Sequence, residues 1–453
     1  MWHRHLPVLV ASACMLGLSA VALAESGPRP PSSDAAIRPL TLEQARMLAL
    51  QNHPALAAAN YRADAEQQVE IETRAGLLPQ VALVGSAAEG GADNTRILAG
   101  GLNNPSVMDR TAGGVLVSQL LTDFGHTTNL LASSTYKARA AEQDVAATRA
   151  QVLLQADAAY FGVLQAQAVQ NVTRQTVDTR QLLLDRVSVL ARNKLKSDLD
   201  VNFARVALEN SQLLLESARN GVENAMATLS AALGLKQPEQ FRLAEVGAPG
   251  SGSEESADIG ALIDQALRDR PDLESLRDQL DAALRYARAE RDARLPTISA
   301  VGAAGAAISH DPRLPANYTA GGIEISIPLF TGGLFRAREH AAEFQAKALG
   351  ESLRDAQDSV GRDVRIALSN LMNARERLHT TQQLVETANE AYELAQARYQ
   401  VGASSIVELS QAQLQQTTAQ IDAATARYEV FTRRSVLQYQ LGELAAVDRN
   451  ALP

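Results

Sequence analysis

The sequence carries one internal repeat, and this duplication restricts the possible folds more than any other feature. The Leu-Pro pairs that end at Pro79 and Pro296 lie 217 positions apart. Further along, the segment LLTDFG that starts at Leu120 matches PLFTGG at Pro328, at a spacing of 208. Because the spacing changes between these motifs, the difference in length falls in the loop that separates them. The chain is therefore predicted to fold as two copies of one unit.

The two repeats share one order of predicted elements. Each begins with an amphipathic helix that ends at Leu-Pro, followed by two short stretches rich in Val, Ile, Ala and Gly. A very long helix, a short break and a return helix complete each unit. We assign the repeats to residues 40–235 and 259–443, with a linker rich in Pro, Gly and Ser at 236–258 and a C-terminal tail at 444–453.

The first 24 residues have the parts of a secretory signal peptide. Arg4 precedes an apolar run that ends in Ala22-Leu23-Ala24, an A-x-A cleavage pattern. The alternative is a membrane anchor, but the polar, Pro-rich segment 25–39 favours cleavage and is expected to be flexible. The single cysteine, Cys14, would leave with the signal peptide, so we expect neither a disulfide nor thiol chemistry.

The second long helix has a heptad pattern with two neighbouring lines of side chains, one large and one small. The large line is Val364, Leu371, Leu378, Val385, Tyr392 and Tyr399, and the small line is Ala367, Ala374, Thr381, Ala388 and Ala395. After the break, the spacing of seven continues on the return helix at Val407, Leu414, Ile421 and Tyr428. The first long helix, predicted at about 126–192, would extend about 100 Å. That length favours a protein that crosses the periplasm.

Four short segments are predicted strands, at about 80–91, 111–121, 297–309 and 319–330. Their length is near that of a tilted transmembrane strand, and part of the pattern alternates between apolar and polar residues. One interpretation is a small soluble sheet that caps a helical bundle. If the strands enter a membrane instead, four strands leave two open edges, whose backbone groups have no partner in lipid. The membrane interpretation, which we favour, therefore requires an oligomer.

Composition and motifs argue against a nucleic-acid-binding protein and against an enzyme. Lys and Arg total 42 against 51 Asp and Glu, a net charge of -9, whereas phosphate binding needs a basic face. The sequence has no H-E-x-x-H, G-x-S-x-G or Walker motif, and no histidines at metal-ligand spacing. We therefore predict no catalytic residue, no cofactor and no metal site.

Taken together, the repeat, the Leu-Pro strand starts, PLFTGG and YQVGASSIVEL resemble the TolC-like outer-membrane efflux family. The resemblance implies a mainly α fold with a small membrane β-barrel contribution. A homotrimer would form a 12-stranded barrel in outer-membrane lipid and an α-helical barrel in the periplasm of a Gram-negative bacterium. Such a protein is the exit duct of a tripartite efflux or type I secretion system. Its partners would be a periplasmic adaptor and a proton-driven or ABC-type inner-membrane pump.

The same resemblance implies that the two breaks between long and return helices lie at the periplasmic mouth. It implies gate or constriction roles for Glu408, Asp200, Tyr399 and, where many relatives have a second acid, Gln411. The tip residues for adaptor docking would be Val401, Gly402, Ser404, Ser405, Asn193 and Lys194. Because the first break has no glycine, Asn193 is expected to take its left-handed conformation.

Simpler interpretations remain open for these residues and for the chain. Glu408 lies at a helix start, where an acid is favoured by the helix dipole. Tyr399 belongs to the apolar seam, and Asp200 is a polar residue that water could solvate. The chain as a whole could be a periplasmic coiled-coil adaptor or scaffold without a pore, but such a protein would have one helical hairpin, and this sequence predicts two.

Overall fold

The computed structural model describes residues 39–88, 110–237, 239, 241–247, 258–309 and 315–446. The predicted signal peptide and the predicted flexible segment lie outside the described residues, except for Pro39. In the part of the chain that is described, no helix has both the length and the apolar character needed to cross a membrane.

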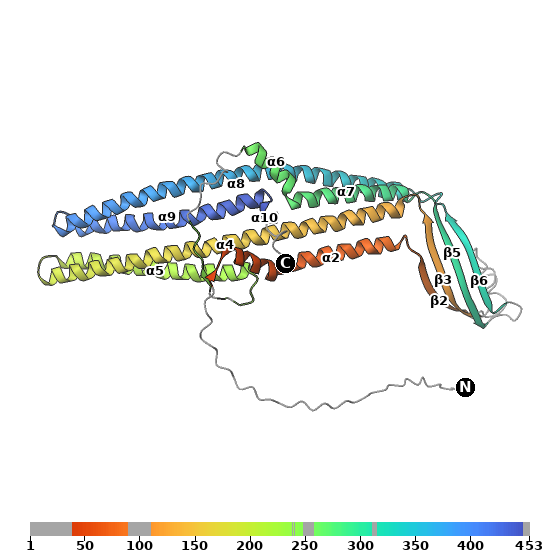
Figure 1. Ribbon diagram of the computed structural model, residues 1–453, viewed down its shortest axis with the longest axis horizontal. Coiled ribbons are helices and arrows are strands. Elements are labelled where there is room, and N and C mark those ends of the chain that lie inside the picture. Colours follow the sequence, from red (N-terminus) through yellow and green to blue (C-terminus); the bar gives the residue numbers. More distant parts are fainter. Residues whose placement is uncertain are drawn as a thin grey trace, which may run out of the picture. The chain divides into compact units, whose positions relative to one another are not determined.

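The duplication predicted from the sequence is visible in the helices (Figure 1). The long helices α4 (His126–Arg192) and α8 (Leu334–Gln400) have 67 residues each. The return helices α5 (Asp198–Ala232) and α9 (Ile406–Gln440) have 35 residues each. Helix α4 packs against α5, α8 packs against α9, and the two hairpins meet along α4 and α9.

Two shorter helices precede the strands in each repeat. In the first repeat these are α1 (Leu42–Asn52) and α2 (Pro54–Ala75), and in the second α6 (Ile259–Asp269) and α7 (Pro271–Asp292). The proline at the first position of α2 and of α7 starts a new helix, because it lacks the N–H that the preceding helix would need. Both α2 and α7 pack along α4, and α7 also packs along α8.

One four-stranded antiparallel sheet joins the two repeats, in the order β2-β3-β5-β6. Its strands are β2 (Gln80–Ala88), β3 (Arg110–Thr122), β5 (Thr297–Ser309) and β6 (Asn317–Ser326). Among the described residues, β2 and β6 each pair on one side only. The sheet thus has two open edges, as expected for four strands in one chain.

One strand differs from its prediction, and the predicted end of another is not tested. Strand β2 ends at Ala88, and residues 89–91 of the predicted strand lie outside the described residues. Strand β6 starts at Asn317 and ends at Ser326 instead of continuing to residue 330. Pro328 follows closely and has no N–H to donate to a sheet ladder, which accounts for the earlier end.

The register of the sheet gives its two faces different chemistry. One face carries the apolar side chains of β2, β3 and β6, since Val81 pairs with Val117 and Leu83 with Val115. On that face Val81 is 67% exposed, Leu83 85%, Ile323 68% and Ile325 60%. The opposite face is mixed: its alternate positions hold Gln80, Ser118, Ser299 and Glu324, together with Val84 and Leu116. Among the described residues, the large apolar side chains of β2, β3 and β6 on the first face are thus exposed.

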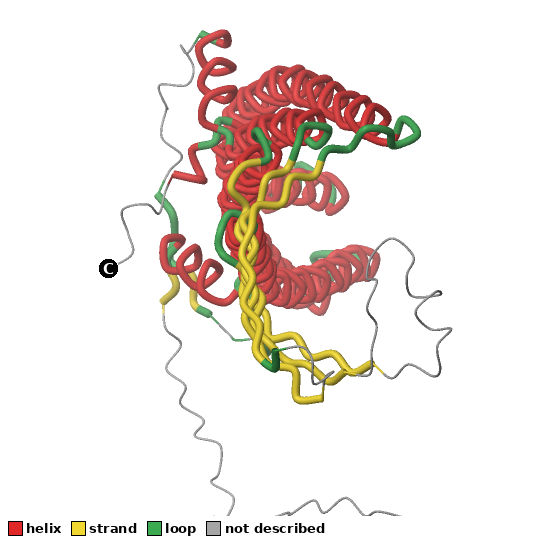
Figure 2. Tube along the Cα trace, turned by 90° about the vertical axis from the view of Figure 1, so that its right-hand side faces the viewer, coloured by secondary structure: helices red, strands yellow, loops and turns green. Residues whose placement is uncertain are grey.

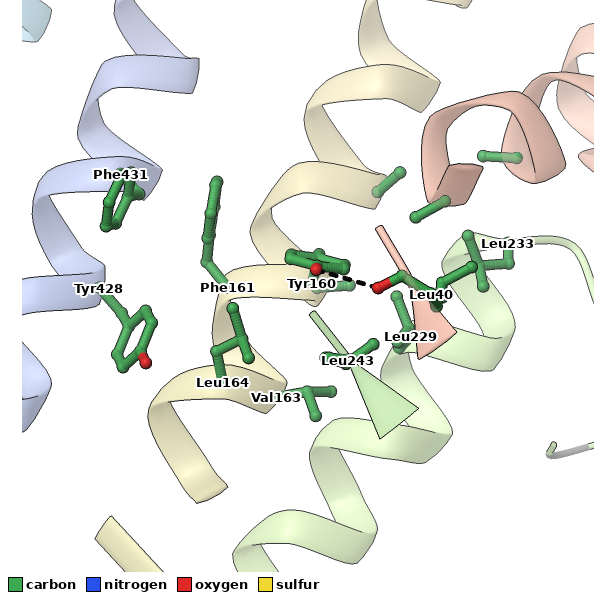
Figure 3. Close-up of a cluster of buried hydrophobic side chains, with 14 of the residues drawn as sticks. Leu40, Tyr160, Phe161, Val163, Leu164, Leu229, Leu233, Leu243, Tyr428 and Phe431 are labelled. Atoms are coloured by element: carbon green, nitrogen blue, oxygen red, sulfur yellow. Dashed lines mark hydrogen bonds between the residues drawn. The ribbon is translucent and has the colours of Figure 1, made fainter. Parts of the chain in front are cut away.

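Part of the predicted linker forms a second small sheet. Within it, β4 (Arg242–Leu243) pairs in parallel with β1 (Pro39–Leu40). The Tyr160 hydroxyl, from the middle of α4, donates to the carbonyl oxygen of Leu40 at 3.1 Å (Figure 3). It also donates to the carbonyl oxygen of Ala244 at 2.8 Å. Residues 242–244 are thus held against the middle of α4, where the buried Tyr160 hydroxyl finds its hydrogen-bond partners.

Both lines of the α8 heptad pattern are buried or half-buried, as predicted. On the return helix the predicted line is buried only in part: Val407 and Leu414 are 52% and 51% exposed, whereas Ile421 is half-buried and Tyr428 is buried. Helix α9 packs against α4 as well as α8, and these two neighbours together select the buried residues. Near the turn these are Ile406, Leu409, Ala412, Gln413, Thr417 and Ala419, and further along α9 they are Ala426, Tyr428, Val430, Phe431, Ser435 and Leu437.

The start of the predicted tail is also folded. Helix α10 (Glu443–Ala446) places Leu444 in a buried cluster with Leu153 of α4. Viewed along the helices of the described unit, the long and return helices lie in an open arc, and the strands form a strip in front of them (Figure 2).

Candidate functional site: the two hairpin turns

The turn between α4 and α5 is closed by two backbone hydrogen bonds at the end of α4. The Leu195 N–H donates to the Leu190 carbonyl and the Lys194 N–H to the Ala191 carbonyl, both at 2.9 Å. These six-to-one and five-to-two bonds form a Schellman motif, which satisfies carbonyl groups that the helix end leaves free.

The turn between α8 and α9 has the same hydrogen bonds, 208 positions later. The Ala403 N–H donates to the Arg398 carbonyl at 2.8 Å, and the Gly402 N–H donates to the Tyr399 carbonyl at 3.1 Å. In this turn the left-handed position is Gly402, with φ of +77°. A glycine has no Cβ and takes this conformation without strain.

The prediction that Asn193 takes the left-handed conformation is wrong. Asn193 has φ of -88°, and Lys194 occupies the left-handed region with φ of +60°. Helix α4 continues to Arg192, so the Schellman motif puts its left-handed residue one position after Asn193. A non-glycine residue in this region is strained by about 1–2 kcal/mol.

The return helices begin with serine caps, but the acids that follow behave differently. The Ser197 hydroxyl accepts from the Asp200 N–H at 3.2 Å, and the Asp200 carboxylate accepts from the Ser197 N–H at 3.0 Å. This reciprocal pair is a capping box. In the other turn, the Ser405 hydroxyl accepts from the Glu408 N–H at 3.3 Å. The Glu408 carboxylate instead forms an ion pair with Arg398, at 3.3 Å between Oε1 and Nη1.

A buried cluster fixes the two turns to one another. Its buried members are Val187, Ala395, Tyr399, Ile406, Leu409 and Ala412, with Leu183, Val201 and Tyr392 packed against them. Three of these residues come from the first hairpin and six from the second. The tip is therefore a site where the two repeats make direct side-chain contact.

Tyr399 has an unusual environment in this cluster. The side chain is 5% exposed, and its hydroxyl is buried with no hydrogen-bond partner among the described residues. Burial raises the pKa of Tyr399 to about 12, and the nearby Asp200 carboxylate adds to the rise. The Asp200 side chain is used by the capping box, so the structure brings these two predicted residues close without a hydrogen bond between them.

The other predicted residues lie on the surface of the turns. Glu408 and Gln411 are exposed on α9 and, being three residues apart, share one side of the helix. Val401, Gly402, Ser405, Asn193 and Lys194 are exposed, and Ser404 is half-buried. All of the predicted tip residues are thus within the two turns, at the ends of the hairpins away from the sheet (Figure 1).

Two charged residues of this site are absent from the predicted set. Lys196 lies with its Nζ 4.0 Å from the centre of the Tyr399 ring, and Arg398 pairs with Glu408. Their positions carry a weak signal in the sequence. Arg398 and Glu408 lie on either side of a predicted hairpin turn, which brings them together, and Lys196 lies in the other break that the resemblance places at the periplasmic mouth. In the described part of the chain, no group of His, Cys, Asp and Glu side chains could hold a metal ion.

Comparison with known proteins finds a family that this chain matches. The family model for outer membrane efflux proteins matches residues 46–235 and 262–443, one match in each repeat. The chain is 25% identical over 429 residues to the outer membrane protein TolC of Salmonella enteritidis, covering 90% of this chain and 82% of that protein.

Solved structures show the same fold. The outer-membrane channel OprN matches with a TM-score of 0.75 and 21% identity, over 89% of this chain and 90% of that one. The outer membrane protein VceC of Vibrio cholerae matches with a TM-score of 0.75 and 19% identity, over 88% and 96%. The chain belongs to the outer membrane efflux protein family, whose members are channels of the Gram-negative outer membrane.

Proposed function

We propose that this protein is the outer-membrane exit duct of a tripartite efflux or type I secretion system. In this proposal, three copies each contribute four strands to a 12-stranded barrel and two hairpins to a periplasmic helical barrel. Cargo arrives from an inner-membrane pump through a periplasmic adaptor and passes through passively. The duct needs no catalytic residue, because the pump supplies the energy.

The observation that carries this proposal is the two-faced sheet with two open edges. An apolar face that exposes Leu83, Ile323 and Ile325 is unfavourable in water and suits contact with lipid. Unpaired backbone groups at β2 and β6 are costly in lipid unless another strand pairs with them. Oligomerisation of identical sheets satisfies both requirements, because β2 and β6 run in opposite directions and can pair across a protomer boundary.

The length of the hairpins supports a periplasmic duct. A helix of 67 residues extends about 100 Å, so the turns lie far from the strands to which the same helices connect. A soluble adaptor would not need a lipid-facing sheet or a second hairpin. We accordingly propose that the turns at 193–197 and 401–405 form the periplasmic end and dock the adaptor.

Fractionation tests the proposal against the adaptor alternative. We expect the protein to stay with outer membranes through a carbonate wash, and to migrate differently on denaturing gels before and after heating. Release of the protein by carbonate would contradict a membrane-embedded sheet and would favour the soluble scaffold.

Within this duct, we propose that Glu408 lines the narrowest part of the periplasmic end. A ring of carboxylates raises the local concentration of cations. Glu408→Ala should therefore lower cation preference in planar bilayers, an effect reduced in size by the Arg398 partner. The control is Glu376→Ala, which removes an exposed carboxylate of α8 away from the turns. Equal selectivity in both variants would remove Glu408 from the constriction.

A further inference from the structure

One polar contact of the tip joins the two hairpins through an aromatic ring. Lys196 belongs to the turn of the first hairpin, and Tyr399 lies in the last turn of α8 in the second. The Lys196 Nζ is 4.0 Å from the centre of the Tyr399 ring. An ammonium group at this distance is attracted by the negative face of the ring, most strongly where the pair is shielded from water.

The hydroxyl of Tyr399 does not supply such a link. It is buried and makes no hydrogen bond within the described residues. The nearest acid that influences it, Asp200, accepts two hydrogen bonds from Ser197, one from its N–H and one from its hydroxyl. The ring face, and not the oxygen, is therefore the part of Tyr399 that contacts a charged group across the tip.

The other charged contact at the turns lies within a single hairpin. Arg398 and Glu408 belong to α8 and α9, so their ion pair closes the second turn without touching the first. Val187 and the other members of the tip cluster contact the second hairpin through apolar groups. Apolar contacts have little directional preference, whereas a cation above a ring fixes the position of the turn that carries it.

We propose that Lys196 is a locking residue, which holds the first hairpin turn against the second through the face of the Tyr399 ring. The proposal rests on the function proposed above, because it assigns a role at the periplasmic end of a duct. Loss of the contact removes an interaction that exists only while the turns are together, so the population shifts toward separated turns and an open duct.

Recordings from the full-length protein in planar bilayers test this role. Lys196→Met keeps much of the length of the side chain and removes its charge. We expect open-state occupancy to rise by about two- to thirty-fold, the range for a contact of this class. The matched control is Arg192→Met, which removes an exposed positive charge four residues earlier and should leave occupancy unchanged. Equal effects of the two substitutions would overturn the proposal, since charge alone would then explain them.

Two substitutions of Tyr399 separate the ring from the hydroxyl. Tyr399→Phe keeps the ring and should leave open-state occupancy as in the wild type. An increase equal to that of Lys196→Met would overturn the proposal in favour of a link through the hydroxyl. Tyr399→Leu removes the ring, so adding Lys196→Met to it should raise occupancy no further. If the two substitutions instead raise open-state occupancy by factors that multiply in the double variant, the lysine acts through a group other than the ring.

A conservative variant guards against misfolding as an explanation. In Lys196→Arg, the guanidinium group stacks on an aromatic face, so occupancy should stay close to that of the wild type. Open-state occupancy in Lys196→Arg as high as that in Lys196→Met would overturn the proposed role of the ring contact. A wild-type protein that never conducts would overturn the proposed function and this role together, whereas a conducting wild type with an unchanged Lys196→Met variant overturns the lock alone.

Discussion

The two hairpin turns share one backbone geometry but bury different side chains. In the second turn, Ile406 and Leu409 are buried in the tip cluster. At the equivalent positions of the first turn, 208 residues earlier, the chain has Asp198, which is exposed, and Val201, which is half-buried. The first turn also exposes Leu195 and Leu199, at 69% and 64%.

This difference shows how a duplicated backbone can carry two roles. The hydrogen bonds of the Schellman motif involve only main-chain groups, so the turn persists while its side chains change. The second turn has become the apolar anchor of the tip. The first turn presents a charged residue, Lys196, to that anchor and leaves its apolar side chains on the surface.

Shortening apolar side chains at equivalent positions should give the largest difference in stability between the two turns. Leu409→Ala removes a side chain that is 1% exposed and should raise the free energy of the closed tip by about 3 kcal/mol. Val201→Ala removes a half-buried side chain and should cost about 1 kcal/mol. Amide hydrogen exchange at the two turns measures both costs. Equal protection in the two variants would mean that the second turn is not the anchor.

Exchanging the left-handed residues should have a smaller effect of opposite sign in the two turns. Gly402→Ala places a side chain at φ of +77° and should destabilise its turn by about 1 kcal/mol. No atom lies within 4 Å of the added Cβ, so the cost comes from the backbone and not from a clash. Lys194→Gly relieves the same strain and should stabilise the first turn by up to about 1 kcal/mol. Hydrogen exchange that slows in Gly402→Ala would contradict this account of the turns.

Much of the fold was predictable because its signals are local and repeated. Heptads marked the buried lines of α8, and the position of Gly402 marked the end of that helix. The strands were found from short apolar stretches with alternating pattern, and the repeat then gave each element twice. The left-handed conformation of Lys194 was not predicted from residue preferences. The Schellman motif requires this conformation at the residue that follows the helix cap, even when a lysine there is strained.

The candidate site was predictable in place but not in its contacts. Both turns were expected at the periplasmic mouth, but the contact of Lys196 with Tyr399 joins residues about 200 positions apart and depends on how the hairpins pack. The buried side of α9 was missed for a similar reason. A heptad pattern describes one neighbour, whereas α9 has two, and Val407 and Leu414 face neither of them.

The central claim, that β2 and β6 pair between copies of this chain, can be tested by disulfide cross-linking. The only cysteine, Cys14, lies in the predicted signal peptide. In the mature chain, therefore, only introduced cysteines can form a cross-link. One cysteine is placed at Val81 or Leu83 and a second is moved along β6, from Thr319 to Ile325, at alternate residues. We predict that oxidised membranes yield covalent dimers and trimers and nothing larger for at least one pair, and monomers for each single-cysteine variant. Monomers alone for every pair, or a ladder that continues beyond three copies, would contradict the closed trimeric barrel.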